Sequence, residues 1–489
     1  MEYYDDENSG LRILEGEAMT KSYDVAIIGA GSAGLSALRV VRKQTDNYVL
    51  INDGSYGTTC ARVGCMPSKA LIEAANAFHQ RKTLDAFGVS GAERLTVDIT
   101  TVLKRVRRLR DGFVAGMLNL TDEVKDHNIT GRARFLEPQV LEVGERRVHA
   151  KKIIIATGSR PVVPGEWAAF TPWMLTSDDL FEQETLPPRM AVIGMGGLGS
   201  EIAQALSRLG IEITGFDTAG HIAGLSDRQV NNEAVALLRA EFAMHLGQAA
   251  EPMIEGERIR VRAGNESVLV DKILVALGRR PNIDQMGLEN LGVKLDVRGV
   301  PPFDPGTMQI ADLPVYIAGD ANQNLPLLHE ALDEGYIAGY NAMQNKPTCF
   351  QRRVPLAIVF TDPGSAAVGQ RFAELNKDEI VIGEADFFSQ GRARMAEMNH
   401  GLLRVYADKN SGRLLGAEMC APQGEHLAHL LALAVQRKLT LRELLGMPFY
   451  HPVLEEGLRS ALRDAAGKLG GKDLPDLAYC GRMGADAID

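Results

Sequence analysis

A pattern of strand, glycine-rich turn, helix and strand occurs twice in this sequence, and the composition changes beyond Pro347. The first copy begins at Tyr23 with the run YDVAIIG, and the second begins at Met190 with MAVIG. This order of elements opens a Rossmann-like dinucleotide-binding domain. After Pro347 we expect strands alternating with turns and then helices at 425–438 and 454–468. The sequence therefore predicts an α/β protein with two dinucleotide-binding domains and a C-terminal α+β domain.

The glycines of each copy have separate roles. The first makes the tight turn, the second lets the backbone approach a pyrophosphate, and the third lets helix and strand pack closely. The helix N-terminus adds N–H groups and a partial positive charge. One such pattern would be weak, but two copies in the same context predict that the chain binds two dinucleotides. The glycines are Gly29, Gly31 and Gly34 in the first copy and Gly194, Gly196 and Gly199 in the second.

The residue that ends the second strand differs between the copies. Asp217 and Asn52 lie equally far along the chain from the first glycines of their copies. A carboxylate at Asp217 would accept a hydrogen bond from an adenosine 2′-hydroxyl and repel a 2′-phosphate, so we expect NAD rather than NADP there. Asn52 is uncharged but can still hydrogen-bond a ribose. An ordinary loop acid is the alternative interpretation of Asp217.

Charge and cysteine usage exclude several function classes. The net charge of −10 argues against nucleic acid as a partner. The only basic cluster, 104–110, falls in an expected helix and is typical of a solvated helix face. The apolar run at 25–38 is interrupted by glycines, which argues against a membrane span. Residues 1–20 are acidic and unlike a targeting segment. Five cysteines do not suggest a secreted disulfide framework, so we expect a cytoplasmic location.

Two cysteines follow directly after the first copy of the pattern. Cys60 and Cys65 precede a stretch to Arg81 that we expect to be helical. At a helix start the two thiols can reach each other, and the helix dipole favours a thiolate. Half of a zinc site is an alternative, although the sequence has no second cysteine pair to complete four ligands. Beside a flavin, such a pair would accept or donate two electrons as a dithiol–disulfide couple.

The run GTTCARVGCMPSK at 57–69 resembles the redox-active signature GGTCxxxGCxPSK of the pyridine nucleotide–disulfide oxidoreductases. The resemblance extends from about Tyr23 to about Leu462. The segment LHEALDEG at 328–335 is similar to that of the dihydrolipoamide dehydrogenases within this family. The resemblance implies FAD in the first dinucleotide-binding domain, NAD in the second, and a C-terminal dimerisation domain.

The resemblance also gives the expected domains and cofactor residues. The domains are an acidic tail at 1–20, a FAD-binding domain at 21–158 and 279–348, a NAD-binding domain at 159–278, a dimerisation domain at 349–475 and a C-terminal tail at 476–489. Besides the first three glycines, the residues expected at FAD are Asn52, Thr59, Lys69, Ala133, Thr157, Gly158 and Asp320. Besides the second three, those expected at NAD and the adjoining flavin side are Glu201, Asp217 and Gly278.

The run HPVLEE at 451–456 resembles the family's HPTxSE motif. From the pattern alone, His451 could equally be a packed turn residue. The resemblance implies that His451 is the acid–base catalyst, that Glu456 orients it, and that it works on the cysteine pair of the other subunit. An obligate homodimer with composite active sites is therefore expected.

The implied reaction is the oxidation of dihydrolipoamide, on a lipoyl-bearing carrier or as a small molecule. His451 would deprotonate the substrate, whose thiolate attacks Cys60, and Cys65, nearer the flavin, would pass electrons to FAD and on to NAD. Lys69 and Glu201 resemble the family's ion pair beside the flavin. Departures from the family pattern at Asn52, Gly197 and Val453 leave two alternatives, which are an NADH-dependent reductase of another disulfide or quinone-like acceptor and a flavoprotein redox sensor.

Three further cysteines and a pair of histidines are candidates for metal binding or thiol chemistry. We expect no metal site, because His426 and His429, although spaced like ligands on an expected helix, have no further ligands in the pattern. Cys349, Cys420 and Cys480 are interpreted as unreactive thiols.

Overall fold

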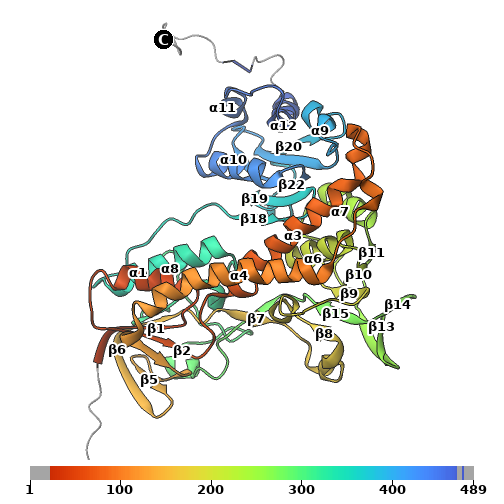
Figure 1. Ribbon diagram of the computed structural model, residues 1–489. Coiled ribbons are helices and arrows are strands. Elements are labelled where there is room, and N and C mark those ends of the chain that lie inside the picture. The colour runs from red at the N-terminus through yellow and green to blue at the C-terminus, as the bar shows by residue number, and fades with distance from the viewer. Residues whose placement is uncertain (1–21, 471–475, 478–489) are drawn as a thin grey trace, which may run out of the picture. The chain divides into compact units, whose positions relative to one another are not determined.

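The structure, a computed structural model, describes residues 22–470 and 476–477 and divides into two compact units (Figure 1). Unit 1 comprises 22–55, 124–158 and 281–350, and unit 2 comprises 56–123, 159–280 and the described residues from 351 onward. The two short strands β7 (Ser159–Pro161) and β16 (Arg279–Pro281) lie where the chain passes from one unit to the other. The acidic tail at 1–20 and residues 478–489 lie outside the described residues, and the domain boundaries given above stay predictions.

Unit 1 is built on a seven-stranded sheet in which β1 (Ser22–Ile28) is central. Strand β1 pairs in parallel with β2 (Tyr48–Asn52) on one side and with β6 (Arg146–Ile155) on the other. Its second half is buried and continuously apolar rather than alternating, because a parallel strand is covered on both faces. The other strands of this sheet are β3 (Asn128–Thr130), β4 (Ala133–Glu137), β5 (Val140–Val143) and β17 (Val315–Ile317).

Two helices of unit 1, α1 (Ser32–Val41) and α8 (Leu328–Ala342), lie side by side in Figure 1. Their backbones approach closely because α8 carries glycines on the contact face. A Cβ atom at Gly335 would lie 2.1 Å from the carbonyl oxygen of Ala33, and one at Gly339 would lie 2.8 Å from the Cα of Ala37. Helix α1 is the helix that follows the first glycine turn, so α8 fixes the position of that turn.

Unit 2 contains the second copy of the repeated pattern as a five-stranded parallel sheet in the order β11-β10-β9-β15-β8. Strand β9 is followed by the glycine turn and α6, and β10 by α7. An antiparallel three-stranded sheet, β12-β13-β14, is inserted in the chain between β11 and β15. The elements are β8 (Met174–Leu175), α5 (Ser177–Leu180), β9 (Arg189–Ile193), α6 (Gly197–Arg208), β10 (Glu212–Asp217), α7 (Arg228–Arg239), β11 (Ala243–Leu246), β12 (Glu251–Glu255), β13 (Arg258–Ala263), β14 (Glu266–Val270) and β15 (Lys272–Val275).

Three helices of unit 2 precede this sheet in the chain: α2 (Thr59–Arg62), α3 (Cys65–His79) and α4 (Ile99–Asp122). The helix predicted to extend to Arg81 ends at His79 and continues as a short 3-10 turn. The basic cluster lies on α4, as predicted, and part of it docks the helix. Arg105 donates to the carbonyl oxygen of Ala70 on α3 over 3.1 Å, and Arg110 is paired with Glu182.

The C-terminal part of unit 2 is an antiparallel sheet in the order β18-β19-β22-β21-β20 with helices packed on it. The helices expected at 425–438 and 454–468 are present as α10 and α12, so the predicted α/β protein with a C-terminal α+β region is confirmed. The elements are β18 (Leu356–Val359), β19 (Gly364–Gly369), β20 (Ile380–Asp386), α9 (Gly391–Met395), β21 (Leu402–Asp408), β22 (Leu414–Ala421), α10 (Gly424–Gln436), α11 (Leu441–Leu445) and α12 (Glu455–Lys468).

Among the described residues, no helix is both long enough and apolar enough to span a bilayer.

The close approach of α1 and α8 predicts that a glycine-to-alanine substitution is destabilising at the contact and harmless at an open helical position. Gly335→Ala should lower the free energy of unfolding by about 2 kcal/mol, because the new methyl group meets backbone rather than a flexible side chain. Gly467→Ala on α12 is the matched control, since a Cβ there meets nothing within 4 Å among the described residues. It should be neutral or stabilising by up to about 1 kcal/mol. Urea unfolding of both variants measures the difference, and equal stabilities would contradict the packing.

Candidate active site

The cysteine pair lies where two helices of unit 2 meet. Cys60 is on α2, and Cys65 is the first residue of α3. Thr58 caps α2 by accepting a hydrogen bond from the Ala61 amide over 3.2 Å. The structure holds both cysteines as thiols, hydrogen bonded to each other, with Cys60 partly buried and Cys65 exposed. The two residues that the sequence analysis paired are therefore brought together.

The surroundings of the pair favour a thiolate at Cys65. A hydrogen bond from the Cys60 thiol lowers the pKa of Cys65 to about 7, and the Lys69 ammonium acts in the same direction. Burial and the Glu201 carboxylate oppose this shift. The same hydrogen bond, together with burial, raises the pKa of Cys60. Cys65 is thus the sulfur that ionises first and Cys60 the hydrogen-bond donor, which gives the two sulfur atoms different chemistry.

Lys69 and Glu201 form an ion pair next to these cysteines. The Lys69 Nζ lies 2.9 Å and 2.8 Å from the two carboxylate oxygens of Glu201. Lys69 is one turn beyond Cys65 on α3, and Glu201 is on α6, where it is only 4% exposed. A carboxylate buried to this degree must be paired, so the lysine is held where it also acts on Cys65.

His451 and Glu456 also contact each other, as the motif predicts. The imidazole Nδ1 lies 3.0 Å and 3.1 Å from the two oxygens of Glu456, which is the second residue of α12. The hydrogen bond from His451 lowers the pKa of Glu456. With Nδ1–H held by the carboxylate, Nε2 is the nitrogen that can take a proton. The His451 side chain is 79% exposed, so this nitrogen is accessible to another molecule.

The first glycine turn has the form that the sequence predicts. Gly29 has φ of +109°, and a Cβ there would lie 2.3 Å from the carbonyl oxygen of Ala156. A Cβ at Gly34 would lie 1.9 Å from the Gly29 oxygen, so helix and strand are in close contact. A Cβ at Gly31, the N-cap of α1, would meet no atom of the described residues within 4 Å. Backbone N–H groups at this helix start are thus accessible to a phosphate.

Asn52 replaces an acid at the end of β2 and still organises the turn. Its Oδ1 accepts a hydrogen bond from the Ala30 amide over 3.2 Å, and its Nδ2 donates to the Gly54 carbonyl over 2.6 Å. In the second copy, Asp217 Oδ2 accepts from the Met195 amide over 2.6 Å. Since Ala30 and Met195 each follow the first glycine of their copy, the amide and the carboxylate perform the same structural task.

The other residues expected at FAD are distributed over both units. Ala133 is buried on β4, Thr157 and Gly158 follow β6, and Asp320 is on the 3-10 helix Gly319–Asn322 that follows β17, all in unit 1. Thr59 and Lys69 belong to unit 2. The sequence analysis missed the role of Glu334, whose fully buried Oε2 accepts hydrogen bonds from the Gly319 amide and the Asn322 side chain, both over 2.7 Å. In the sequence it belongs to the run LHEALDEG at 328–335, from which no role for this carboxylate was inferred.

In unit 2, the second glycine turn and a cavity lie at the carboxyl ends of the parallel strands. A Cβ at Gly199 would lie 1.7 Å from the Gly194 oxygen, and one at Gly196 would meet nothing within 4 Å among the described residues. Gly278 has φ of +90°. Asp217 contributes to the wall of a cavity of about 450 Å³, whose other residues include Trp167, Ile193, Thr218, Pro252 and Leu277. This is the position at which Rossmann-like domains bind a nucleotide.

The cysteines that the structure describes outside the pair differ in their surroundings. Cys420 is buried on β22, and burial raises its pKa to about 12, as expected of an inert thiol. Cys349 is exposed, and Cys480 lies outside the described residues. Among the residues that the structure describes, no three His, Cys, Asp or Glu side chains are placed to hold a metal ion.

Comparison with known proteins assigns the family. Residues 23–335 match the family described as pyridine nucleotide-disulphide oxidoreductase, and residues 355–462 match the dimerisation domain of the same family. This chain belongs to the pyridine nucleotide-disulphide oxidoreductase family.

Relatives within this family carry different names. The chain is 33% identical to the dihydrolipoyl dehydrogenase of Thermus scotoductus, a match that covers 90% of this chain and 97% of that protein. It is 30% identical to the mercuric reductase of Acidithiobacillus ferrooxidans, covering 93% and 84%. Among solved structures, the HOCl-induced flavoprotein disulfide reductase RclA from Escherichia coli has the same fold, with a TM-score of 0.78 at 22% identity over 90% of this chain and 99% of that one.

Members of this family use FAD and NAD(H), and features of each unit fit them. In unit 1, the N-terminus of α1 is accessible, and the buried Thr157 Oγ1 has no hydrogen-bond partner among the described residues. A hydroxyl of this kind suits a polar cofactor atom. In unit 2, the cavity beside Asp217 suits an adenosine. The expected cofactors are thus those of the family.

The hydrogen bond between the two thiols predicts how the reactivity of Cys65 depends on pH. In the reduced protein, Cys65 should react with iodoacetamide with a midpoint near pH 7, because the alkylated species is the thiolate. Cys60→Ala removes the hydrogen bond that lowers this pKa, so the midpoint should rise by about one unit. Cys349→Ala serves as the control and should leave it unchanged. Mass spectrometry of the Cys65 peptide gives the rates, and an unshifted midpoint in Cys60→Ala would contradict the assignment.

Proposed function

We propose that this chain oxidises dihydrolipoamide, free or on a lipoyl-bearing carrier, and uses NAD as the final electron acceptor. The observation that carries the proposal is the hydrogen-bonded pair of Cys60 and Cys65, in which the two sulfur atoms differ in pKa. The similarity to dihydrolipoyl dehydrogenases over almost the whole chain supports this substrate class.

The proposed reaction is a two-electron exchange between two dithiol–disulfide couples. One substrate thiolate attacks Cys60 in the oxidised pair, and Cys65 leaves as a thiolate. The second substrate thiol then attacks the mixed disulfide, which releases the cyclic disulfide product and reduced Cys60. A low pKa makes Cys65 a good leaving group, and the higher pKa of Cys60 lets it keep a proton. When bound, FAD would supply the acceptor for this electron pair, and NAD would be the final acceptor.

His451 is the proposed acid–base group for the substrate thiols. Its Nδ1 is held by Glu456, so its Nε2 can accept the proton of the first thiol. The carboxylate would stabilise the imidazolium that forms. The His451 side chain is highly exposed within one chain. Together with the family's dimerisation domain, this exposure supports a homodimer in which His451 of one protomer serves the cysteine pair of the other.

A second candidate is the NADH-dependent reduction of another disulfide. One observation keeps it open: relatives at about the same identity include mercuric reductases, so similarity at this level does not fix the substrate. The cysteine chemistry would be the same, with the electrons moving in the opposite direction.

The test is NADH formation from dihydrolipoamide by the purified, FAD-loaded protein. The wild type and Cys349→Ser, a matched change at an exposed cysteine, should turn over equally. Cys60→Ser should lose at least about 10³-fold in kcat with FAD still bound, because the sulfur that the substrate attacks is gone. NADP should be a poor acceptor, because Asp217 repels a 2′-phosphate.

Two results would reject the proposal in different ways. Turnover that survives in Cys60→Ser would show that the cysteine pair is not the reacting couple. Absence of turnover in a wild type whose flavin is still reduced by NADH would exclude dihydrolipoamide and favour the second candidate.

A further inference from the structure

One face of α6 binds the segment that joins β18 to β19 in unit 2, here called the 359–363 segment. Positions 197, 201, 204 and 208 of α6 are separated by four, three and four residues, so they lie along a single helix face. Each of them contacts this segment: Gly197 faces Val359, Glu201 binds Phe360, and the last two bind Asp362. The same helix also contacts α3, which begins at Cys65.

At the cysteine end of this face, Phe360 makes two contacts with the ion pair. Its backbone amide donates to Glu201 Oε1 over 2.8 Å. Its ring lies under the ammonium of Lys69, with Nζ 4.5 Å from the ring centroid. The amide adds a third hydrogen bond to a buried carboxylate that already accepts two from Lys69. The ring attracts the cation from another side, since the face of an aromatic ring is electron-rich.

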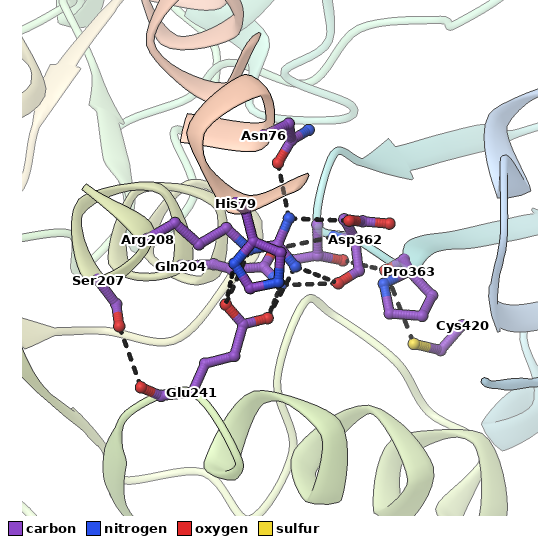
Figure 2. Close-up of polar contacts among 10 residues, drawn as sticks. Asn76, His79, Gln204, Ser207, Arg208, Glu241, Asp362, Pro363 and Cys420 are labelled. Atoms are coloured by element: carbon purple, nitrogen blue, oxygen red, sulfur yellow. Dashed lines mark hydrogen bonds and ion pairs between the residues drawn. The ribbon is translucent and has the colours of Figure 1, made fainter. Parts of the chain in front are cut away.

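At the other end of the face, Arg208 anchors the segment through contacts that Figure 2 shows. Its Nη1 donates to Asn76 of α3 over 2.7 Å and to the Asp362 carboxylate over 2.8 Å. Gln204 exchanges hydrogen bonds with the Asp362 backbone over 2.7 Å and 2.8 Å. Glu241 neutralises Arg208 through two bonds of 2.8 Å. The backbone at Phe360 is therefore held in place by its neighbours, whatever its own side chain is.

We propose that Phe360 is a positioning residue for the cysteine pair, and that its amide and ring together hold the Lys69–Glu201 ion pair in place beside Cys65. The inference rests on the proposed redox role of Cys60 and Cys65 and adds a residue that nothing in that proposal uses. Phe360 acts on Cys65 through Lys69 and Glu201, which it contacts directly.

The charges around Cys65 give this role a measurable consequence. The groups that face the thiol are Cys60 on α2, Lys69 on its own helix and Glu201 on α6. Lys69 favours the thiolate and Glu201 opposes it, so the balance depends on where the ammonium lies. The Lys69 side chain is 32% exposed and has a path to solvent. Without the ring, the ammonium would spend more time in water, and the thiolate would lose part of its stabilisation.

The experiment compares Phe360→Leu with Phe360→Tyr in the reduced, FAD-loaded protein. The alkylation rate of Cys65 with iodoacetamide is followed against pH. Phe360→Leu keeps the backbone amide and loses the ring, so the midpoint should rise by about half a pH unit. Phe360→Tyr keeps the ring and should retain the wild-type midpoint. Phe87→Leu, an exposed phenylalanine on another element, is the matched control and should not shift.

A double-variant comparison separates a positioning role from a general loosening of the fold. Lys69→Met alone should raise the midpoint, and adding Phe360→Leu to it should cause no further shift, because the ring acts through the ammonium. An unshifted midpoint in Phe360→Leu, or an additive shift in the double variant, would overturn the proposal. Absence of a pH-dependent Cys65 reaction in the wild type as well as in every variant would instead count against the thiolate on which the redox proposal for Cys65 rests.

Discussion

The buried carboxylate of Glu201 is the constraint on which the arrangement of the cysteine pair depends. A carboxylate that is 4% exposed must have its charge and its lone pairs satisfied within the protein. Lys69 supplies the charge and two hydrogen bonds, and the amide of Phe360 supplies a third. Satisfying Glu201 thus fixes three elements at once: α3 with the cysteine pair, α6, and the 359–363 segment. The same ion pair sets the charge that Cys65 experiences.

A second buried network secures the C-terminal sheet against α7 within unit 2. Asp227, the N-cap of α7, accepts two hydrogen bonds of 2.7 Å from Arg404 and one of 2.9 Å from Tyr406. The fully buried Glu418 accepts from the Ser226 and Asp227 amides over 2.7 Å and 2.8 Å. Charges of this kind would be costly if either partner were missing. Since 359–363 leads into this sheet, the network also stabilises the anchor of the ion pair.

The sequence predicted those parts of the site that are encoded locally. Both glycine turns, the helix beginning at Cys65 and the contact of His451 with Glu456 each depend on residues within about one turn or one βαβ unit of each other. The pattern did not predict where this helix ends. Helix α3 stops at His79 rather than Arg81, because a 3-10 turn follows. Asn52 departs from the family pattern, and the structure shows its side-chain amide binding the glycine turn as the Asp217 carboxylate does.

The contacts that the sequence did not predict join residues far apart in the chain. Glu201 and Phe360 are separated by 159 residues, and Arg208 and Asp362 by 154. Each of these residues, read alone, is an ordinary surface polar or core aromatic residue. Only the register of α6 against the 359–363 segment shows that they share one helix face. Glu334 is different, because its partners lie only 15 and 12 residues before it, on the turn that begins at Gly319.

The central claim is that Cys60 and Cys65 form a two-electron couple that works with the flavin. An anaerobic reductive titration of the FAD-loaded protein with dithionite tests it without any assumption about the substrate. The account predicts that the wild type takes up about four electrons per chain and Cys60→Ser about two, because a disulfide accepts one electron pair beyond that of the flavin. Uptake of about two electrons by both proteins would contradict it.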